Sequence, residues 1–322
     1  MNNKFYSHRK FLLEEFIAYQ RAINYKFENI YTYNQLDRFF LQMNKTESIG
    51  VTKEECEQWS IKRTTEKTST QYTRISKLNI FCIFLQKKGL KTSFPYQVKN
   101  RTSFKPYIYS SSEIIKIFKG CEKLAMDKPR SCRHIFPTYF KLLYTTGIRK
   151  NEGLHLAISD VDLVNGTILI REPKNGKDRL LPLSNSIKQE MFNFSNRYNK
   201  YSNKDELFFR TLENNKPVNE KSLTVWFVKI LKDAEIPYLG GGKGPRIHDL
   251  RYCFATQSLI NMIKNGMDIY CCIPILSQYL GHSSIEATEH YVYLIKEIYP
   301  NIIKAKSMQT FDFLSKGGFD EK

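Results

Sequence analysis

The sequence lacks long hydrophobic runs, and it lacks the cysteine spacings that mark zinc sites. Its longest uninterrupted apolar run is the six residues from Ile80 to Leu85, whereas a membrane-spanning helix needs about 20. No apolar stretch follows the polar residues 1–4, so we expect neither a membrane anchor nor a secretory signal. The seven cysteines include no Cys-x-x-Cys pair, which favours reduced thiols in a cytoplasmic protein. We predict no metal and no cofactor.

Acidic residues are scarce relative to basic ones. The 322 residues contain 50 Lys and Arg against 32 Asp and Glu, a net charge of +18, and 41% are hydrophobic, which is enough to build folded cores. A folded chain with this charge repels itself, and a polyanionic partner explains that most simply. Nucleic acid is favoured over an acidic membrane surface; a generically basic protein is the alternative. Residues 1–106 carry 19 basic and 9 acidic groups, so this third is the most basic part.

The chain divides by pattern into two predicted domains. Apolar residues at helical spacing in the first hundred residues predict three or four short amphipathic helices. Residues 91–112 are polar and contain Pro95 and Pro106, which indicates an exposed linker. We therefore predict an N-terminal helical domain over residues 1–105 and a second domain over residues 106–322.

The second domain combines helices with a small sheet. Asn165-Gly166 and Asn175-Gly176 are strong hairpin turns, and the residues between them are β-prone. Residues 160–183 are therefore predicted to form a three-stranded antiparallel meander, with Lys174 beside its second turn. The predicted fold class is mainly α with a small antiparallel β-meander (α+β). Residues 301–322 keep apolar side chains, which indicates a docked tail.

Several basic residues lie where their side chains can meet an anion. His248 and Arg251 are three residues apart at a predicted helix start, so both project from one face. The guanidinium offers a planar fork to a phosphate, and the imidazole can donate or accept a proton. Arg149 follows a predicted helix end at Gly147, and Glu152 can hold its guanidinium by an ion pair. Taken singly, each pattern also fits an ordinary surface position.

Order and spacing together resemble the tyrosine recombinase family of phage integrases and Xer-type resolvases. The resemblance rests on five elements: Arg149 within residues 146–152, Lys174 beside a β-turn, His248-Asp249-Leu250-Arg251, Leu280-Gly281-His282, and Tyr291 nine residues after that histidine. Residues 177–183 are similar to the strand that follows the family's catalytic lysine. The resemblance covers residues 107–300, whereas residues 1–106 match only in kind.

The resemblance implies a two-domain, C-shaped DNA clamp with a helical core-binding domain and a catalytic domain. It implies a metal- and ATP-independent strand transfer through a 3′-phosphotyrosyl intermediate. By this resemblance Tyr291 is the nucleophile, and Arg149 and Arg251 bind the phosphate. Lys174 protonates the leaving oxygen, and His248 assists proton transfer. His282 forms a hydrogen bond to the phosphate. Glu152 would orient Arg149. Lys177 is the alternative lysine, and Tyr293, two residues after Tyr291, should point away if that segment is helical.

Contacts to DNA are predicted from the densest basic stretch of the first domain, although a solvated helix face explains the same pattern. The stretch comprises Lys62, Arg63, Lys67, Arg74 and Lys77. The resemblance further implies double-stranded DNA with inverted-repeat core sites, a tetramer on two DNA sites with residues 301–322 docking on a neighbouring protomer, and accessory DNA-bending or directionality proteins. It implies a cytoplasmic, nucleoid-associated protein.

Two other functions stay open at this point. One is a type IB topoisomerase-like enzyme that relaxes DNA, and the other is a catalytically silent DNA-binding protein of the same fold. The sequence also leaves open the DNA target and the choice between integration, excision and dimer resolution.

Overall fold

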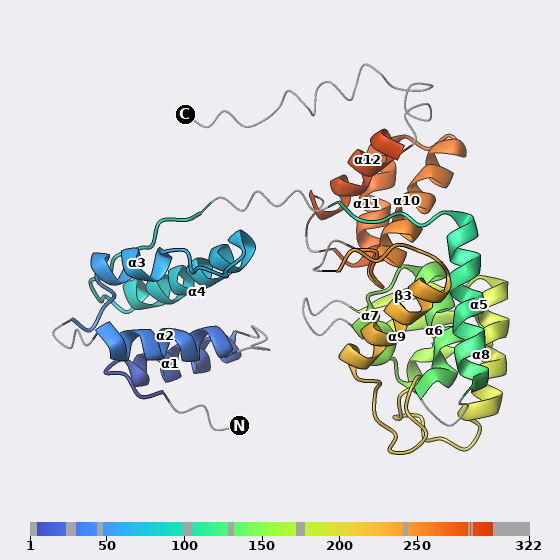
Figure 1. Ribbon diagram of the computed structural model, residues 1–322, viewed down its shortest axis with the longest axis horizontal. Helices are drawn as coiled ribbons and strands as arrows, with labels where there is room; N and C mark the ends of the chain where they lie inside the picture. Colours follow the sequence, from blue (N-terminus) through green and yellow to red (C-terminus); the bar gives the residue numbers. More distant parts are fainter. Residues whose placement is uncertain are drawn as a thin grey trace. The chain divides into compact units, whose positions relative to one another are not determined.

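The computed structural model describes most of the chain as two compact units, residues 1–104 and 105–322 (Figure 1). The described residues are 5–23, 30–43, 48–98, 105–127, 132–171, 178–240, 244–282, 284 and 286–298. The predicted fold class is confirmed, because the described chain is mainly helical with one small antiparallel sheet. The predicted docking of residues 301–322 lies outside the described residues.

The described part of the first unit contains four helices around an aromatic core. These are α1 (Lys10–Ala22), α2 (Tyr31–Met43), α3 (Lys53–Ser60) and α4 (Thr68–Lys87). Phe16 of α1 is fully buried and meets Phe81 of α4 edge-on, with ring centroids 5.4 Å apart. A capping box begins α3, in which Thr52 and Glu55 each bond the other's backbone N–H. Aromatic contacts such as that between Phe16 and Phe81 join helices that would be marginal in isolation.

Two arginines lie inside this unit. Arg9 is paired with Glu55 at 2.7 Å, and both side chains are fully buried. Arg74 is paired with Glu66 at 2.8 Å and stacks over the ring of Trp59. The predicted DNA contact by Arg74 is therefore wrong: the residue is only 4% exposed, and its guanidinium is held by groups of its own unit.

The second unit is built around α6, which packs against α5, α8 and α10. Its elements are α5 (Ser111–Asp127), η1 (Cys132–Ile135), α6 (Phe136–Thr146), α7 (Lys150–Leu154), η2 (Ile158–Asp160), β1 (Val161–Asp162), β2 (Thr167–Ile170), β3 (Arg179–Pro182), α8 (Asn185–Tyr198), α9 (Glu220–Asp233), α10 (Asp249–Lys264), α11 (Ile269–Leu280) and α12 (Glu286–Ile298). Helices α10, α11 and α12 bury a second apolar cluster of this unit. None of the described helices is both long and apolar enough to cross a membrane.

The predicted meander is confirmed as a three-stranded sheet in the order β1-β2-β3. Both strand pairs are antiparallel, with Val161 opposite Ile168 and Ile170 opposite Arg179. Gly166 adopts a φ of +70° in the turn between β1 and β2, a conformation that glycine adopts without strain. The second turn, with Lys174 and Lys177, lies outside the described residues.

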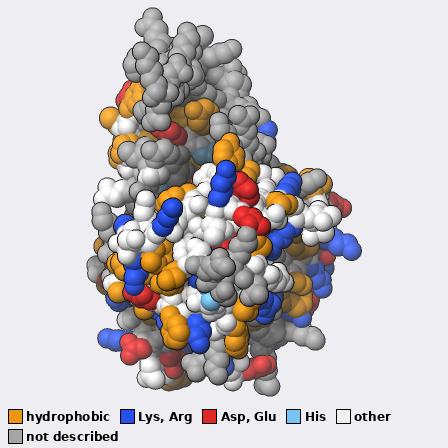
Figure 2. Space-filling model, turned by 90° about the vertical axis from the view of Figure 1, so that its left-hand side faces the viewer, with side chains coloured by type: hydrophobic (Ala, Val, Ile, Leu, Met, Phe, Trp, Pro, Cys, Tyr) orange, Lys and Arg blue, Asp and Glu red, His pale blue; other side chains and the backbone are white. Residues whose placement is uncertain are grey.

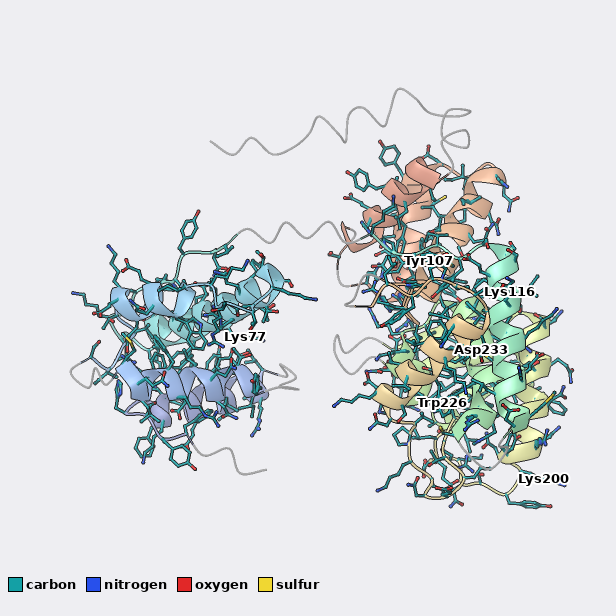
Figure 3. The ribbon with its side chains drawn as sticks, viewed as in Figure 1. Lys77, Tyr107, Lys116, Lys200, Trp226 and Asp233 are labelled. Atoms are coloured by element: carbon teal, nitrogen blue, oxygen red, sulfur yellow. The ribbon has the colours of Figure 1, made fainter. Side chains whose placement is uncertain are left out.

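The predicted exposed linker over residues 91–112 is wrong at both ends. On the first unit, the Ser93 N–H donates to the Val51 carbonyl at 2.8 Å. On the second, Tyr109 is 6% exposed, and its N–H and hydroxyl donate to the Cys253 Sγ and the Arg246 carbonyl. Tyr107, two residues before Tyr109, is labelled on the second unit in Figure 3. Both flanks are thus packed onto the units that they join.

The seven cysteines are all free, and they differ in accessibility. Cys271, in the first turn of α11, is exposed, and Cys132 is half-buried. The others, Cys56, Cys82, Cys121, Cys253 and Cys272, are buried.

Candidate active site

Three arginines from three different elements meet at the C-terminal end of α11. They donate to three successive backbone carbonyls: Arg179 to Tyr279 at 3.1 Å, Arg251 to Leu280 at 2.7 Å, and Arg149 to Gly281 at 2.6 Å. The last carbonyls of a helix lack partners within the helix and lie at the negative end of its dipole. The end of α11 therefore gathers cations that are far apart in the sequence.

The carboxylate of Glu152 bridges two of these arginines. Its Oε1 lies 2.6 Å from the Arg149 Nη1, and its Oε2 lies 2.6 Å from the Arg179 Nη2. Oε2 also accepts the backbone N–H of Arg149 at 2.7 Å. Burial acts to raise the pKa of Glu152, but the hydrogen bond and charge of Arg179, followed by those of Arg149, hold it below its ordinary value. The ion pair predicted between Glu152 and Arg149 is present.

Arg251 ties two glycine turns together. Its Nη1 donates to the Gly147 carbonyl at 2.8 Å, while its Nη2 reaches the end of α11. Gly147 and Gly281 both have left-handed backbones, with φ of +63° and +66°. A Cβ on Gly147 would lie 2.3 Å from the ring of Phe254, so no side chain fits there without movement. Burial lowers the pKa of Arg251 from its usual value, which still leaves a guanidinium charged at neutral pH.

Tyr291 of α12 contacts two rings and is 3% exposed. Its ring is nearly parallel to that of His282, at 5.9 Å and 9°, and tilted against that of Tyr252 at 5.3 Å. Burial raises the pKa of the Tyr291 phenol, while the charge of Arg251 and a hydrogen bond to it act in the opposite direction. Tyr293 is 57% exposed, as expected for a residue on the other face of the helix.

The two histidines are kept neutral by their surroundings. Partial burial of His282, followed by the charges of Arg251, Arg149 and Arg179, lowers its pKa to about 4. Burial, followed by the charges of Arg251, Arg246 and Arg149, lowers the pKa of His248 to about 4. His248 is the more exposed of the two, so solvent offsets more of the effect there. The Nδ1 of His282 is 2.7 Å from the Thr288 hydroxyl. At neutral pH both imidazoles can accept a proton as well as donate one.

The structure thus gathers most of the predicted residues and adds one. Arg149, Glu152, Arg251, His282 and Tyr291 are linked through the contacts above, and the ring of His248 lies 5.5 Å from that of Tyr252. Arg179 was missed by sequence reasoning, which treated it only as part of a strand. The sequence signal that could have revealed Arg179 is its position at the start of the strand that follows the predicted turn beside Lys174. Among the described residues, no group of three or more His, Cys, Asp or Glu is arranged to hold a metal ion.

The predicted DNA-contact stretch keeps four surface cations after the loss of Arg74. Lys62, Arg63 and Lys67 are exposed, and Lys77 of α4, labelled in Figure 3, is half-buried. Arg63 lies over the ring of Trp59 at 5.4 Å. On the face drawn in Figure 2, basic side chains are interspersed with acidic and hydrophobic ones.

A buried phenol beside guanidinium groups and neutral imidazoles defines a class of site suited to attack on a phosphate ester. The model of the phage integrase family matches residues 109–297, more than half of the chain, and the chain belongs to this family of tyrosine recombinases. Family members are DNA strand transferases.

The matched fraction of the sequence differs from one relative to another. It is 26% identical over 294 residues to y4rB of Sinorhizobium fredii, whose name assigns it to the integrases or recombinases; the match spans 87% of this chain and 91% of y4rB. It is 33% identical over 152 residues to the tyrosine recombinase XerA of Pyrococcus furiosus, and the match spans 47% of each protein. This chain therefore matches about half the length of that XerA.

The fold is similar to that of solved recombinases. A structure of the XerH site-specific recombinase bound to a palindromic difH substrate has a TM-score of 0.66 at 18% identity, and the match covers 95% of this chain and 98% of XerH.

Proposed function

We propose that this protein is a site-specific DNA recombinase that cuts and rejoins DNA through a 3′-phosphotyrosyl intermediate. The observation that carries the proposal is the position of Tyr291, buried beside Arg251, which shares the end of α11 with Arg149 and Arg179. A duplex phosphate is the natural ligand for such a cluster, because guanidinium groups bind its oxygens in pairs.

In the proposed reaction, the Tyr291 hydroxyl oxygen attacks phosphorus and the bond to the 5′-oxygen breaks. The products are a 3′-phosphotyrosyl enzyme and a free 5′-hydroxyl. Attack by the 5′-hydroxyl of a second strand reverses the chemistry and restores tyrosine. The covalent bond conserves the phosphodiester energy, so no ATP is consumed.

The remaining residues handle charge and protons. Arg149 and Arg251 bind the non-bridging oxygens, and each well-placed donor contributes about 3–4 kcal/mol to the transition state. A tyrosine phenol has a reference pKa of about 10, and burial raises that of Tyr291 further, so attack requires a base. Neutral His248 takes this proton, His282 donates a hydrogen bond to the phosphate, and Lys174 or Lys177 protonates the leaving oxygen.

In this proposal residues 1–105 bind DNA and residues 106–322 catalyse the reaction. Lys62, Arg63, Lys67 and Lys77 contact the phosphate backbone in this proposal. The DNA carries inverted repeats, and the active assembly is a tetramer on two sites. A solved tetramer of lambda integrase on a Holliday junction, with a TM-score of 0.58, supports the comparison at the level of the fold. The choice between a mobile-element integrase and an Xer-like resolvase belongs to this proposal and depends on the DNA site.

A nicked duplex that carries the proposed inverted-repeat site, sought in the DNA next to the gene, tests the proposal. The wild-type protein should form a covalent DNA adduct on a denaturing gel, and Tyr291→Phe should form none. Tyr293→Phe is the matched control, because it removes the exposed hydroxyl two residues away and should leave the adduct intact. An adduct in Tyr291→Phe would contradict the assignment of the nucleophile.

Two further outcomes separate the competing functions. Relaxation of a supercoiled plasmid that lacks the repeats would favour a topoisomerase. Tight binding of the repeats without any adduct would favour a silent DNA-binding protein.

A further inference from the structure

Arg179 has the contacts of a residue that acts through its neighbours. Its side chain is 10% exposed, whereas that of Arg149 is 34% exposed. The Arg179 Nε and Nη2 are directed at the Tyr279 carbonyl and at Glu152. Arg149 is therefore the more accessible of the two to an incoming phosphate, and Arg179 faces the protein.

The shared carboxylate gives Arg179 an electrostatic role. Glu152 contacts both guanidiniums at the same distance of 2.6 Å, so its negative charge is divided between them. Without Arg179, that charge would be directed at Arg149 alone and would neutralise much of the field that Arg149 presents to an anion. At an effective dielectric constant of about 20, unit charges about 4 Å apart interact strongly. The charge of Glu152 therefore changes how strongly Arg149 attracts an anion.

Arg179 also fixes the turn to which the other two arginines bind. A Cβ placed on Gly281 would lie 2.9 Å from the Arg179 Nη1, so the turn and the guanidinium are in contact. Arg149 and Arg251 are anchored on the Gly281 and Leu280 carbonyls of the same turn. A shift of this turn would move both anchors together.

We propose that Arg179 is a positioning residue of the active site: it takes up part of the charge of Glu152 and holds the Gly281 turn, so that Arg149 keeps its positive charge for the phosphate. The inference rests on the proposed function, in which Arg149 binds the scissile phosphate. Arg179 acts in this proposal through Glu152 and the Tyr279 carbonyl, to which its Nη2 and Nε donate.

Substitution of Arg179 by methionine tests the inference on the full-length protein. Arg179→Met should slow adduct formation on the nicked duplex by about 10- to 100-fold, while equilibrium binding of the duplex changes by no more than about twofold. The matched control is Arg171→Met, which also takes an arginine away from a buried carboxylate: Arg171 follows β2 and is 61% exposed, and its partner Asp160, 2.7 Å away, is 4% exposed. This control should react at the wild-type rate. Equal rates for the two variants would overturn the inference.

A double variant separates positioning from loss of structure. If Arg179 acts by sharing the charge of Glu152, removing that charge should relieve the defect. Arg179→Met with Glu152→Gln should then react at least about threefold faster than Arg179→Met alone. A double variant that is slower than Arg179→Met, as expected when two structural defects add, would overturn the charge-sharing role.

A binding measurement covers the case in which the protein forms no adduct. Inorganic phosphate, titrated at constant ionic strength, should raise the melting temperature of the wild type and of Arg171→Met. The rise should be smaller in Arg179→Met and should recover in the double variant. This pattern without any adduct would contradict the proposed reaction and support the positioning role. An adduct in the wild type with the same phosphate response in all variants would do the reverse.

Discussion

The turn at Gly147 offers a sharp prediction, because two separate penalties of a side chain there can be measured. Gly147 has a φ of +63°, and its carbonyl is an anchor of Arg251. An alanine Cβ would lie 2.3 Å from the Phe254 ring, well inside contact distance. The left-handed backbone costs an alanine about 1 kcal/mol, and overpacking adds about 1–3 kcal/mol. We expect Gly147→Ala to destabilise the second unit by about 2–4 kcal/mol.

A second glycine of the same unit isolates the steric part. Gly240 has a φ of +65°, but no atom of the described residues lies within 4 Å of the position of its Cβ. Gly240→Ala should therefore cost about 1 kcal/mol, from the backbone alone. For a unit of this size, each kcal/mol lowers the melting temperature by about 2–4 °C. The expected losses are about 4–16 °C for Gly147→Ala and about 2–4 °C for Gly240→Ala.

Tryptophan fluorescence can report the second unit by itself. The chain has two tryptophans, Trp59 in the first unit and Trp226 in the second, the latter on α9 and labelled in Figure 3. In a Trp59→Phe background, thermal unfolding followed by fluorescence monitors Trp226. Equal melting temperatures for Gly147→Ala and Gly240→Ala would refute the steric argument. A smaller penalty of Gly147→Ala when Phe254 is also replaced by alanine would support it.

Three further predictions concern pH, the buried ion pair and the surface cations. The pKa of His282 is lowered from 6.5 to about 4, so between these pH values the unfolded chain binds a proton that the folded protein does not. The free energy of unfolding should therefore decrease as the pH is lowered from 6.5 to 4, by at most about 3.4 kcal/mol. His282→Asn should flatten this part of a denaturant-derived stability profile. Arg74→Met should lower the melting temperature of the first unit, because it leaves Glu66 buried without its partner at a cost of about 3–5 kcal/mol, and an unchanged melting temperature would contradict the pairing. Lys62→Gln and Lys77→Gln should each reduce the slope of log affinity against log salt for a mixed-sequence duplex by about one, whereas an unchanged slope would remove that lysine from the DNA contacts.

Local signals in the sequence predicted the elements well. The Asn165-Gly166 pair encodes the turn between β1 and β2 within two residues, and the predicted pairing of these strands is confirmed. Helix α10 begins at Asp249, one residue after His248, where the sequence predicted a helix start. Such features depend on neighbours in the chain and can therefore be predicted from it.

Contacts between distant residues limited what could be predicted of the site. The Glu152 pair with Arg149 spans three residues and was expected, but Arg179 bonds to Tyr279, 100 residues away. The burial of Arg74 likewise depends on the packing of Trp59 and Ile61 around it. A basic residue on a helix has the same appearance in the sequence whether it faces solvent or a buried carboxylate.

The distribution of the cysteines makes the natural chain suitable for site-directed labelling. Cys271 is exposed, whereas five of the other thiols are buried and Cys132 is half-buried, so a maleimide dye should react first at Cys271 without any engineered cysteine. Cys271 lies on α11, about 15 Å along the helix axis from its end at Gly281. A dye at this position would sit on the helix whose last carbonyls hold the three arginines. Its fluorescence could then follow the binding of a phosphate or of DNA in real time.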